Sequence, residues 1–307
     1  MIAIDLGSNS FRCIEYDCET KMFGRSFERI VGTADRMHQT GRISDEAVRR
    51  VAKALEEADA ALDLSGSRVK AVTTHAMRRA ANSEQVIEDI KEQSGIAFEI
   101  ISSDDEAYYT LVAVEARLKA LKIESSDFVL IDVGGGSSEI IFYRDGRMQS
   151  RSFPIGIVTT AQTCSAKQEI ESYLAEQFKE VAAYIADYYA TEGKPTAYIA
   201  TAGTPTTMAA YLMGMNHANY DVEKINGYCL TYDGTQKALD DLTGMSERQR
   251  AEIVGTGRER LIIAGIVIVQ KLYTVLGFDE AIVIDDGVRE GVAIDYCQES
   301  ERAQILS

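Results

Sequence analysis

The chain of 307 residues contains a weak second copy of its own N-terminal segment, and this duplication constrains its fold more than any other feature. Residues 4–12 (IDLGSNSFR) and 131–139 (IDVGGGSSE) each read as an apolar strand that ends in Asp, followed by an apolar residue, a glycine and a short loop containing serine. A returning strand and a third strand follow in each copy: 13–16 and Met22–Phe27 in the first, 140–143 and Met148–Phe153 in the second. Agreement over three strands predicts two tandem units rather than the alternative, two unrelated hairpins.

Later elements extend the match. A strand runs into a polar turn and a helix at 69–78 and again at 197–206. Two strands, 127–132 and 281–284, are continuous apolar runs, as expected for a sheet covered on both faces. The apolar spacing also predicts three helices: 46–62 with Ser44 or Asp45 as its cap, 166–190, and a buried helix at 258–276. The pattern indicates an α/β protein with one central sheet in each domain.

The predicted domains are residues 1–124 and 125–297, with the hinge within Ile123–Asp127 because the second copy starts there. Residues 298–307 form a tail that we expect to pack back on the first domain. Two related loops imply a cleft between the domains.

The composition excludes several classes of protein. The net charge of −16 argues against a nucleic-acid binder or a protein of anionic membranes, because both need a basic face. The longest apolar run, Leu261–Val269, is too short for a membrane span, and the N-terminus lacks the pattern of a signal peptide. The five scattered cysteines include no CxxC pair, so we expect reduced thiols in a cytoplasmic protein.

The loop after Asp132 has the chemistry of a phosphate-binding site. Glycines at 134–136 let the backbone approach an oxyanion, and successive N–H groups together with the Ser137 hydroxyl can donate to it. Asp132 would repel a phosphate, so its sensible role is to hold Mg²⁺, with Glu139 facing the same ion. A glycine-rich hairpin with an Asp turn residue is the alternative, and the second Asp-x-Gly loop argues against it.

A second anion site is predicted at Gly203–Thr204–Pro205. Thr204 has the chemistry of an N-cap and Pro205 fits a first helical turn, whose exposed N–H groups favour an anion. An ordinary capped helix fits the same residues. The chain contains neither a GxxxxGK[ST] P-loop nor a complete dinucleotide fingerprint.

Residues 104–106 form an acidic cluster at the predicted start of a helix. Ser103 and Glu106 match a capping box, which is a purely structural role for Glu106. The functional alternative is a general base that orients water for attack on phosphorus. Arg12 and Arg78 are the candidate cations for a phosphoryl group, and surface solvation is their alternative role.

Six segments of the chain resemble the exopolyphosphatase / guanosine pentaphosphate phosphohydrolase (Ppx/GppA) family of the actin-like ATPase superfamily. They are Ala3–Arg12, Thr73–Asn82, Ile101–Ala107, Ile131–Glu139, Ala202–Thr204 and Gly287–Gly291. The resemblance implies two ribonuclease-H-like domains and hydrolysis of a terminal phosphoanhydride in the cleft with Mg²⁺ or another divalent cation. It implies Glu106 as catalytic base and Asp132 and Glu139 as metal-associated acids. The implied phosphate-contacting residues are Ser8, Asn9, Ser10, Arg12, Arg78, Gly134, Gly135, Gly136, Ser137, Gly203 and Thr204.

Departures from the family pattern leave some roles open. Ser103 stands where glycine is usual and the two acids before Glu106 are Asp, so the base could be Asp105 or Glu106; Ser138 replaces a usual threonine. The chain lacks the C-terminal helical region of larger relatives, so processive action on long polyphosphate is not implied.

The implied partners are polyphosphate or the guanosine penta- and tetraphosphates of the stringent response, and the sequence does not choose between them. An actin-like kinase and a non-catalytic (p)ppGpp sensor are the rival functions. Oligomeric state is not readable from the sequence, and a homodimer is compatible with it.

Overall fold

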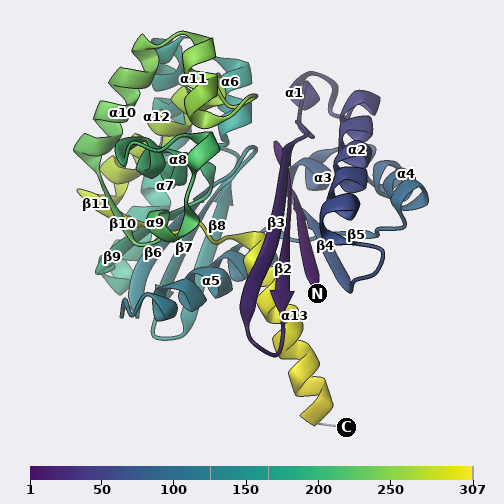
Figure 1. Cartoon of the computed structure of the whole chain (residues 1–307). Helices are drawn as coiled ribbons and strands as arrows, with labels where there is room; N and C mark the ends of the chain where they lie inside the picture. Colours follow the sequence, from purple (N-terminus) through teal and green to yellow (C-terminus); the bar gives the residue numbers. More distant parts are fainter. Residues whose placement is uncertain (125, 165, 306–307) are drawn as a thin grey trace. The chain divides into compact units, whose positions relative to one another are not determined.

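The computed structural model describes residues 1–124, 126–164 and 166–305, which form two compact units (Figure 1). Unit 1 consists of residues 1–116 and the segment from Asp286 onward, and unit 2 consists of Arg117–Asp285. The chain therefore leaves unit 1 within helix α5 (Ser103–Ala120) and returns just before helix α13 (Val288–Ile305).

The chain therefore passes between the units at 116/117 and 285/286, whereas the predicted boundaries were 124/125 and 297/298. Helix α5 runs through the first crossing without interruption, so no change of composition marks it. Residues 288–297 of helix α13 pack on the sheet of unit 1, which places the return before residue 288 and not at the predicted tail.

Unit 1 is built on a sheet with strand order β3-β2-β1-β4-β5. Its strands are β1 (Ile2–Leu6), β2 (Ser10–Asp17), β3 (Met22–Ile30), β4 (Val69–Thr73) and β5 (Phe98–Ile100). Its other helices are α1 (Met37–Thr40), α2 (Asp45–Leu62), α3 (His75–Arg79) and α4 (Ser83–Ser94). Alternate residues of β1 enter two different clusters, because successive side chains of a strand point to opposite faces. One cluster includes α2 and α4 and the other includes α13, which lies along the opposite face in Figure 1.

Unit 2 is built on a sheet with strand order β10-β11-β9-β6-β7-β8. The strands are β6 (Asp127–Val133), β7 (Ser138–Arg144), β8 (Arg147–Phe153), β9 (Ala197–Thr201), β10 (Tyr228–Thr231) and β11 (Glu280–Val283). The helices are α6 (Ile157–Thr163), α7 (Lys167–Glu192), α8 (Gly203–Leu212), the 3₁₀ turn η1 (His217–Asn219), α9 (Val222–Ile225), α10 (Tyr232–Gly244), α11 (Glu247–Val254) and α12 (Leu261–Leu276). Val129, Ile131 and Val133 of β6 face the large core formed with α7 and α12.

The duplication is confirmed by the pairing of the strands. In each unit the first strand pairs antiparallel with the second and parallel with the fourth, as β1 does with β2 and β4, and β6 with β7 and β9. Helix α2 begins after the predicted cap Ser44, whose side chain accepts a hydrogen bond of 3.2 Å from the Ala47 N–H. The predicted helix at 166–190 is α7. Helix α12 begins at Leu261, three residues later than predicted.

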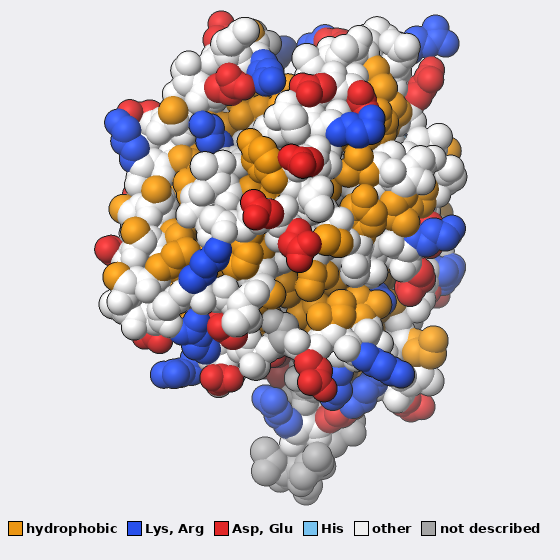
Figure 2. Space-filling view, turned by 90° about the vertical axis from the view of Figure 1, so that its left-hand side faces the viewer, with side chains coloured by type: hydrophobic (Ala, Val, Ile, Leu, Met, Phe, Trp, Pro, Cys, Tyr) orange, Lys and Arg blue, Asp and Glu red, His pale blue; other side chains and the backbone are white. Residues whose placement is uncertain are grey.

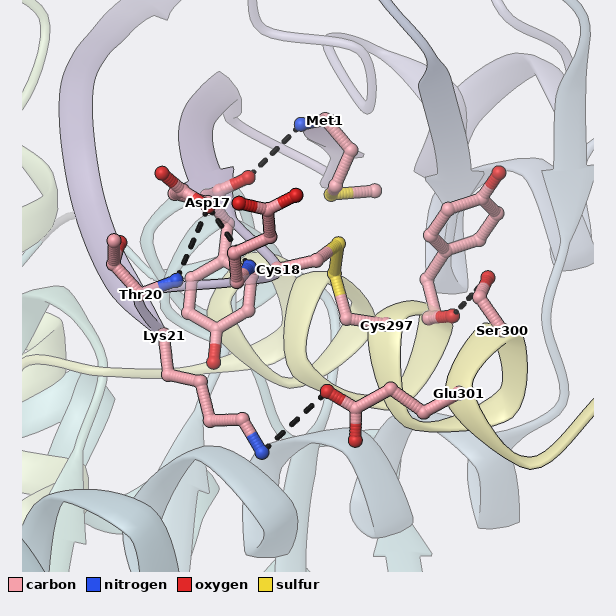
Figure 3. Close-up of a disulfide and its surroundings, with 11 residues drawn as sticks. Met1, Asp17, Cys18, Thr20, Lys21, Cys297, Ser300 and Glu301 are labelled. Carbon is pink, nitrogen blue, oxygen red and sulfur yellow. Dashed lines mark hydrogen bonds and ion pairs between the residues drawn. A yellow bond between two sulfur atoms is a disulfide. The ribbon is translucent and has the colours of Figure 1, made fainter. Parts of the chain in front are cut away.

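The expectation that the cysteines are all reduced is wrong for two of them. Cys18, after β2, and Cys297, on α13, form a disulfide with their Cα atoms 5.4 Å apart (Figure 3). The two residues are 279 positions apart, and the packing of α13 on β1 and β2 brings them together. Beside the disulfide, Lys21 pairs with Glu301 at 3.5 Å. Cys13, Cys164 and Cys229 are free thiols.

Two features of the surface and helices bear on the composition argument. On the face shown in Figure 2, Lys and Arg side chains are interspersed with Asp and Glu side chains. Within the described part of the chain, none of the helices combines the length and apolar character needed to cross a bilayer.

Candidate active site

The two predicted phosphate loops have the same backbone geometry. In unit 1 the paired residues Leu6 and Phe11 close the loop, and the Gly7 N–H donates to the Ser10 carbonyl at 2.9 Å. In unit 2 Val133 and Ser138 close the loop, and the Gly134 N–H donates to the Ser137 carbonyl at 2.9 Å. Ser8 and Asn9 therefore take the turn positions that Gly135 and Gly136 take in the other copy.

In each unit a second segment donates backbone hydrogen bonds to the carbonyl groups of the loop and so fixes its position. In unit 1, residues 31–35 follow β3: the N–H groups of Val31 and Gly32 donate to the Asn9 carbonyl, both at 2.9 Å, and that of Ala34 donates to the Ser8 carbonyl at 2.8 Å. These three bonds hold the turn of the loop on its carbonyl side. We call residues 31–35 the unit 1 brace.

The matching segment in unit 2, residues 155–158, is the unit 2 brace. The Ile157 N–H donates to the Gly134 carbonyl at 3.1 Å and the Val158 N–H donates to the Gly135 carbonyl at 2.8 Å. Gly156 fits directly under the loop, since a Cβ atom added there would lie 2.3 Å from the Gly135 carbonyl oxygen. Sequence reasoning missed Gly156, because its contact depends on how the strand β8 returns to the loop.

The predicted metal-associated acids of unit 2 lie directly opposite each other. Asp132 of β6 pairs in register with Glu139 of β7, which pairs with Ser152 of β8. Glu139 is 2% exposed and Asp132 is 9% exposed. Glu139 Oε1 accepts hydrogen bonds of 2.8 Å from the hydroxyls of Ser137 and Ser152. Cross-strand partners have Cβ atoms about 5 Å apart, so the two carboxylates share one small region.

Unit 1 carries a different set at the same register. Asp5 of β1 pairs with Arg12 of β2, and Arg12 pairs with Glu28 of β3. Arg12 Nε lies 3.4 Å from Glu28 Oε1. The predicted phosphate cation Arg12 is thus placed beside the loop with carboxylates on both neighbouring strands.

The predicted base Glu106 forms an ion pair with the predicted cation Arg78. Arg78 Nη2 donates to Glu106 Oε2 at 2.7 Å, and Arg78 Nη1 donates to the Ile101 carbonyl at 2.9 Å. Both side chains are mostly buried. The structure therefore brings together two residues that the sequence suggested separately for one reaction.

Glu106 does not have the capping role that the sequence also allowed. The capping pair lies one position earlier: the Asp105 N–H donates to Ser102 Oγ at 3.0 Å, and the Ser102 N–H donates to Asp105 Oδ2 at 3.1 Å. Asp105 is exposed and occupied by the cap, whereas Glu106 is buried against Arg78. This difference favours Glu106 over Asp105 as the base.

His75, which the sequence reasoning did not assign, opens helix α3 near the same ion pair. Burial, and then the positive charges of Arg78 and Arg79, lower the pKa of His75 to about 4. The imidazole is therefore neutral at pH 7. In the sequence, the position of His75 in the turn between β4 and α3 is the signal that could have pointed to this residue.

The start of helix α8 differs from the prediction. The helix begins at Gly203, its cap is Ala202, and Thr204 is the second helical residue and not the N-cap. Ala202 has φ 72°, a backbone conformation that turns the chain from β9 straight into the helix. Thr204 is buried, and Gly265 of α12 leaves it room, since a Cβ at Gly265 would lie 2.3 Å from Thr204 Oγ1.

The sheets collect the predicted residues at one edge of each unit. In unit 1 the parallel strands β1, β4 and β5 end together, as the pairs Leu6–Thr73 and Thr73–Ile100 show. The residues that follow these ends are Ser8, Asn9, Ser10, Arg78 and Glu106, with Arg12 on β2. In unit 2 the pair Asp132–Thr201 places the loop 134–137 and the start of α8 at one edge. Ligands of open α/β sheets bind at this carboxyl edge.

Paired buried carboxylates with hydroxyl neighbours fit a hard divalent cation. Mg²⁺ prefers oxygen ligands and commonly takes only one or two carboxylates, with water and phosphate oxygens completing its shell. In the described parts of the chain there is no group of three or more His, Cys, Asp or Glu side chains arranged to hold a metal ion. Asp132 and Glu139 thus fit a metal that is shared with a phosphate rather than one enclosed by protein.

The fold and these two edges define a protein of two actin-like, ribonuclease-H-like domains, each with a loop suited to phosphate. The chain belongs to the Ppx/GppA phosphatase family, whose model matches residues 25–300.

Named relatives cover nearly the whole chain. "Exopolyphosphatase 2" of Mycobacterium tuberculosis is 25% identical over 95% of this chain and 97% of its own length. The structure of an Aquifex aeolicus PPX-GPPA enzyme is 28% identical, covers 96% of this chain and 98% of its own, and has a TM-score of 0.73. An exopolyphosphatase structure from Cytophaga hutchinsonii, 22% identical over 97% of both chains, has a TM-score of 0.84 and supports the fold. The exopolyphosphatase relatives support a hydrolase.

Proposed function

We propose that this protein hydrolyses the terminal phosphoanhydride bond of inorganic polyphosphate or of pppGpp. The observation that carries the proposal is the buried ion pair of Glu106 and Arg78 at the edge that also carries the Ser8–Ser10 loop. A carboxylate held beside a cation next to a phosphate loop has the parts needed to direct water at phosphorus. Family membership and the exopolyphosphatase relatives support the same reaction.

In unit 2 the proposed groups are those that bind phosphate and a metal ion. Asp132 and Glu139 would hold Mg²⁺, which would neutralise charge on the phosphate oxygens. The backbone N–H groups of residues 135–137 and of Gly203 donate to phosphate, while the Gly134 N–H closes the loop on the Ser137 carbonyl. The hydroxyls of Ser137 and Ser152 keep the Glu139 carboxylate in one orientation through their hydrogen bonds.

In unit 1 the proposed groups are the base and its cations. Glu106 orients a water and accepts its proton as the oxygen attacks phosphorus, and the departing chain leaves with the electrons of the broken P–O bond. Arg78 holds the Glu106 carboxylate at 2.7 Å, and its charge, with that of Arg12, stabilises the equatorial oxygens. Ser8, Asn9 and Ser10 fix the orientation of the phosphate.

The deciding experiment compares Glu106→Gln with Asp105→Asn. We expect Glu106→Gln to fold and to lose about 10²–10⁴-fold in phosphate release, because the base is gone. Asp105→Asn keeps an acceptor for the Ser102 N–H and removes only a charge near the helix N-terminus, so its activity should stay within about threefold of wild type while its stability falls by less than about 1 kcal/mol.

The assay uses short polyphosphate, long polyphosphate, pppGpp and ATP, each with and without Mg²⁺, and measures free phosphate. Unchanged turnover in Glu106→Gln would remove Glu106 from the reaction. Phosphate transfer that needs an acceptor alcohol or acid would replace the hydrolase by a kinase, and tight pppGpp binding without turnover would replace it by a sensor.

We also propose that the protein acts in the cytoplasm. The Cys18–Cys297 disulfide is the observation that bears against this location, since cytoplasmic thiols are kept reduced. Trapping the thiols of freshly lysed cells with a maleimide tests it: both cysteines should be labelled in a cytoplasmic protein.

A further inference from the structure

Arg50 of helix α2 is bound to the brace of the unit 1 phosphate loop by three hydrogen bonds. Its Nε donates to the Val31 carbonyl at 2.6 Å, and its Nη2 donates to the Gly32 carbonyl at 3.1 Å and to Asp35 Oδ2 at 2.8 Å. The side chain is 33% exposed, so it reaches inward from a helix whose other face is solvated. No part of the reaction proposed above uses Arg50.

The residues that Arg50 holds are the ones that hold the loop. Val31 and Gly32 accept from Arg50 through their carbonyls and donate through their N–H groups to Asn9. Two backbone units thus connect the guanidinium to the turn of the phosphate loop. A planar guanidinium offers several donors in a fixed arrangement and can bind two carbonyls and a carboxylate at once, which an ammonium group cannot do with the same geometry.

Asp35 completes this arrangement. Gly32 has φ +56°, and a Cβ there would lie 2.6 Å from Asp35 Oδ2, so the carboxylate lies close over the Gly32 backbone. The Asp35 N–H also donates to the Gly32 carbonyl at 3.0 Å. Arg50 and Asp35 therefore fix the brace from its two sides.

The two units stabilise their braces in different ways. In unit 2 the brace continues directly into α6, whose first residues donate to the loop, so a helix fixes it. In unit 1 the brace is followed by α1, a helix of four residues with none buried. Such a short helix buries no residue that could fix the brace, and the hydrogen bonds of Arg50 fix it instead.

We propose that Arg50 is a positioning residue for catalysis: through residues 31–35 it holds Ser8 and Asn9 in the orientation that the transferring phosphate requires. This inference rests on the proposed function. A displacement of about 1 Å in such a loop costs up to about 100-fold in rate. Since the loop stabilises charge that develops during the reaction, the loss should appear mainly in kcat rather than in KM.

The test compares Arg50→Met, Arg50→Lys and Asp35→Asn with the control Arg49→Met, an exposed arginine one position earlier on the same helix. Steady-state kinetics use the substrate that wild type hydrolyses fastest, well below the unfolding temperature of each variant. We expect kcat to fall about 10–100-fold in Arg50→Met, to fall less in Arg50→Lys and Asp35→Asn, and to stay unchanged in Arg49→Met.

Amide hydrogen exchange supplies a readout that does not depend on activity. The N–H groups of Val31, Gly32 and Ala34 should exchange faster in Arg50→Met and be partly restored in Arg50→Lys, while those of α2 stay protected. If Arg50→Met does not fold, the Lys and Asn variants carry the same comparison.

Two results would overturn the inference: kcat within about twofold of wild type in Arg50→Met or in both milder variants, or unchanged exchange at residues 31–34. A lowered unfolding temperature with normal kcat would reduce Arg50 to a structural residue. A wild-type protein that releases no phosphate from any substrate would overturn the proposed function instead, and the exchange experiment would still decide whether Arg50 holds the loop.

Discussion

The two units place different charges at the same positions of the same fold. At the end of the unit 1 hairpin, Asp5, Arg12 and Glu28 lie opposite one another on β1, β2 and β3. The corresponding positions of unit 2 are Asp132, Glu139 and Ser152. The central position is thus a cation in one copy and an anion in the other.

This exchange teaches how one duplicated hairpin can serve two chemical tasks. In unit 1 the positive charge belongs to the Arg12 side chain, which lies between the acids Asp5 and Glu28. In unit 2 two like charges oppose each other directly, which is unfavourable in itself and is relieved by a bound cation. The first copy therefore suits a permanent contact with phosphate oxygens, and the second suits a metal ion that arrives with them.

The largest effect is expected from removing one charge of the unit 2 pair. Asp132→Asn keeps the shape of the side chain but removes a proposed metal ligand, so Mg²⁺-dependent phosphate release should fall by at least about 100-fold. Without Mg²⁺ the same change relieves repulsion from Glu139, and the free energy of unfolding should rise by about 0.2–1 kcal/mol. Urea denaturation with and without Mg²⁺, together with phosphate release, measures both effects.

The matched change in unit 1 is Asp5→Asn, and the exposed Asp187→Asn is the control. Asp5 lies opposite a cation, so its replacement should lower the stability where Asp132→Asn raises it. Stability changes of the same sign in the two variants, or full Mg²⁺-dependent activity in Asp132→Asn, would contradict the contrast between the two copies.

A second difference is that unit 1 alone carries a disulfide among the described residues, and its reduction should give the next largest effect. The cross-link closes a loop of 279 residues. Such cross-links typically stabilise by about 2–4 kcal/mol, and chain entropy gives about 5.6 kcal/mol for a loop of this size. Hydrogen exchange followed by mass spectrometry, with and without dithiothreitol, should show the loss in β1, β2 and α13 and not in the core around α12.

Cys297→Ser should reproduce the effect of the reductant, and adding dithiothreitol to that variant should change nothing more. Equal losses of protection in both units would show that the disulfide does not act on unit 1 in particular.

Features that depend on neighbouring residues were predictable from the sequence. The two short hairpin loops, the helix α2 with its Ser44 cap and the long helix α7 follow from local spacing and turn chemistry. The register of Asp132 with Glu139 was also predictable, because a short loop fixes which residues of a hairpin face each other.

Features that depend on distant contacts were not predictable. Arg78 and Glu106 meet only because β4 and β5 lie side by side, and Cys18 meets Cys297 only because α13 returns to the first sheet. The false N-cap at Thr204 shows a related limit: hydroxyl chemistry pointed to Thr204, but the positive φ of Ala202 starts the helix earlier. Such a backbone conformation is rare in a residue other than glycine, and local preference does not predict it.

The smallest effects separate the two braces. Gly156→Ala places a Cβ 2.3 Å from the Gly135 carbonyl oxygen, so the backbone of the unit 2 loop has to move. We expect a loss of about 1–3 kcal/mol in stability and a fall in phosphate release, because the N–H groups of the loop shift with it.

Gly32→Ala in unit 1 meets the Asp35 carboxylate at 2.6 Å, a side chain that Arg50 binds, rather than an atom of the loop. Its expected loss is about 1–2 kcal/mol, from the positive φ of Gly32 rather than from a collision with the loop. Urea denaturation and kcat on the same substrate compare the pair. At equal loss of stability, Gly156→Ala should lose more kcat than Gly32→Ala, because only the first pushes directly on atoms of a phosphate loop. A larger loss of kcat in Gly32→Ala would contradict this expectation. It would mean that phosphate release depends more on the unit 1 loop, beside Arg12, than on the unit 2 loop, beside Asp132 and Glu139.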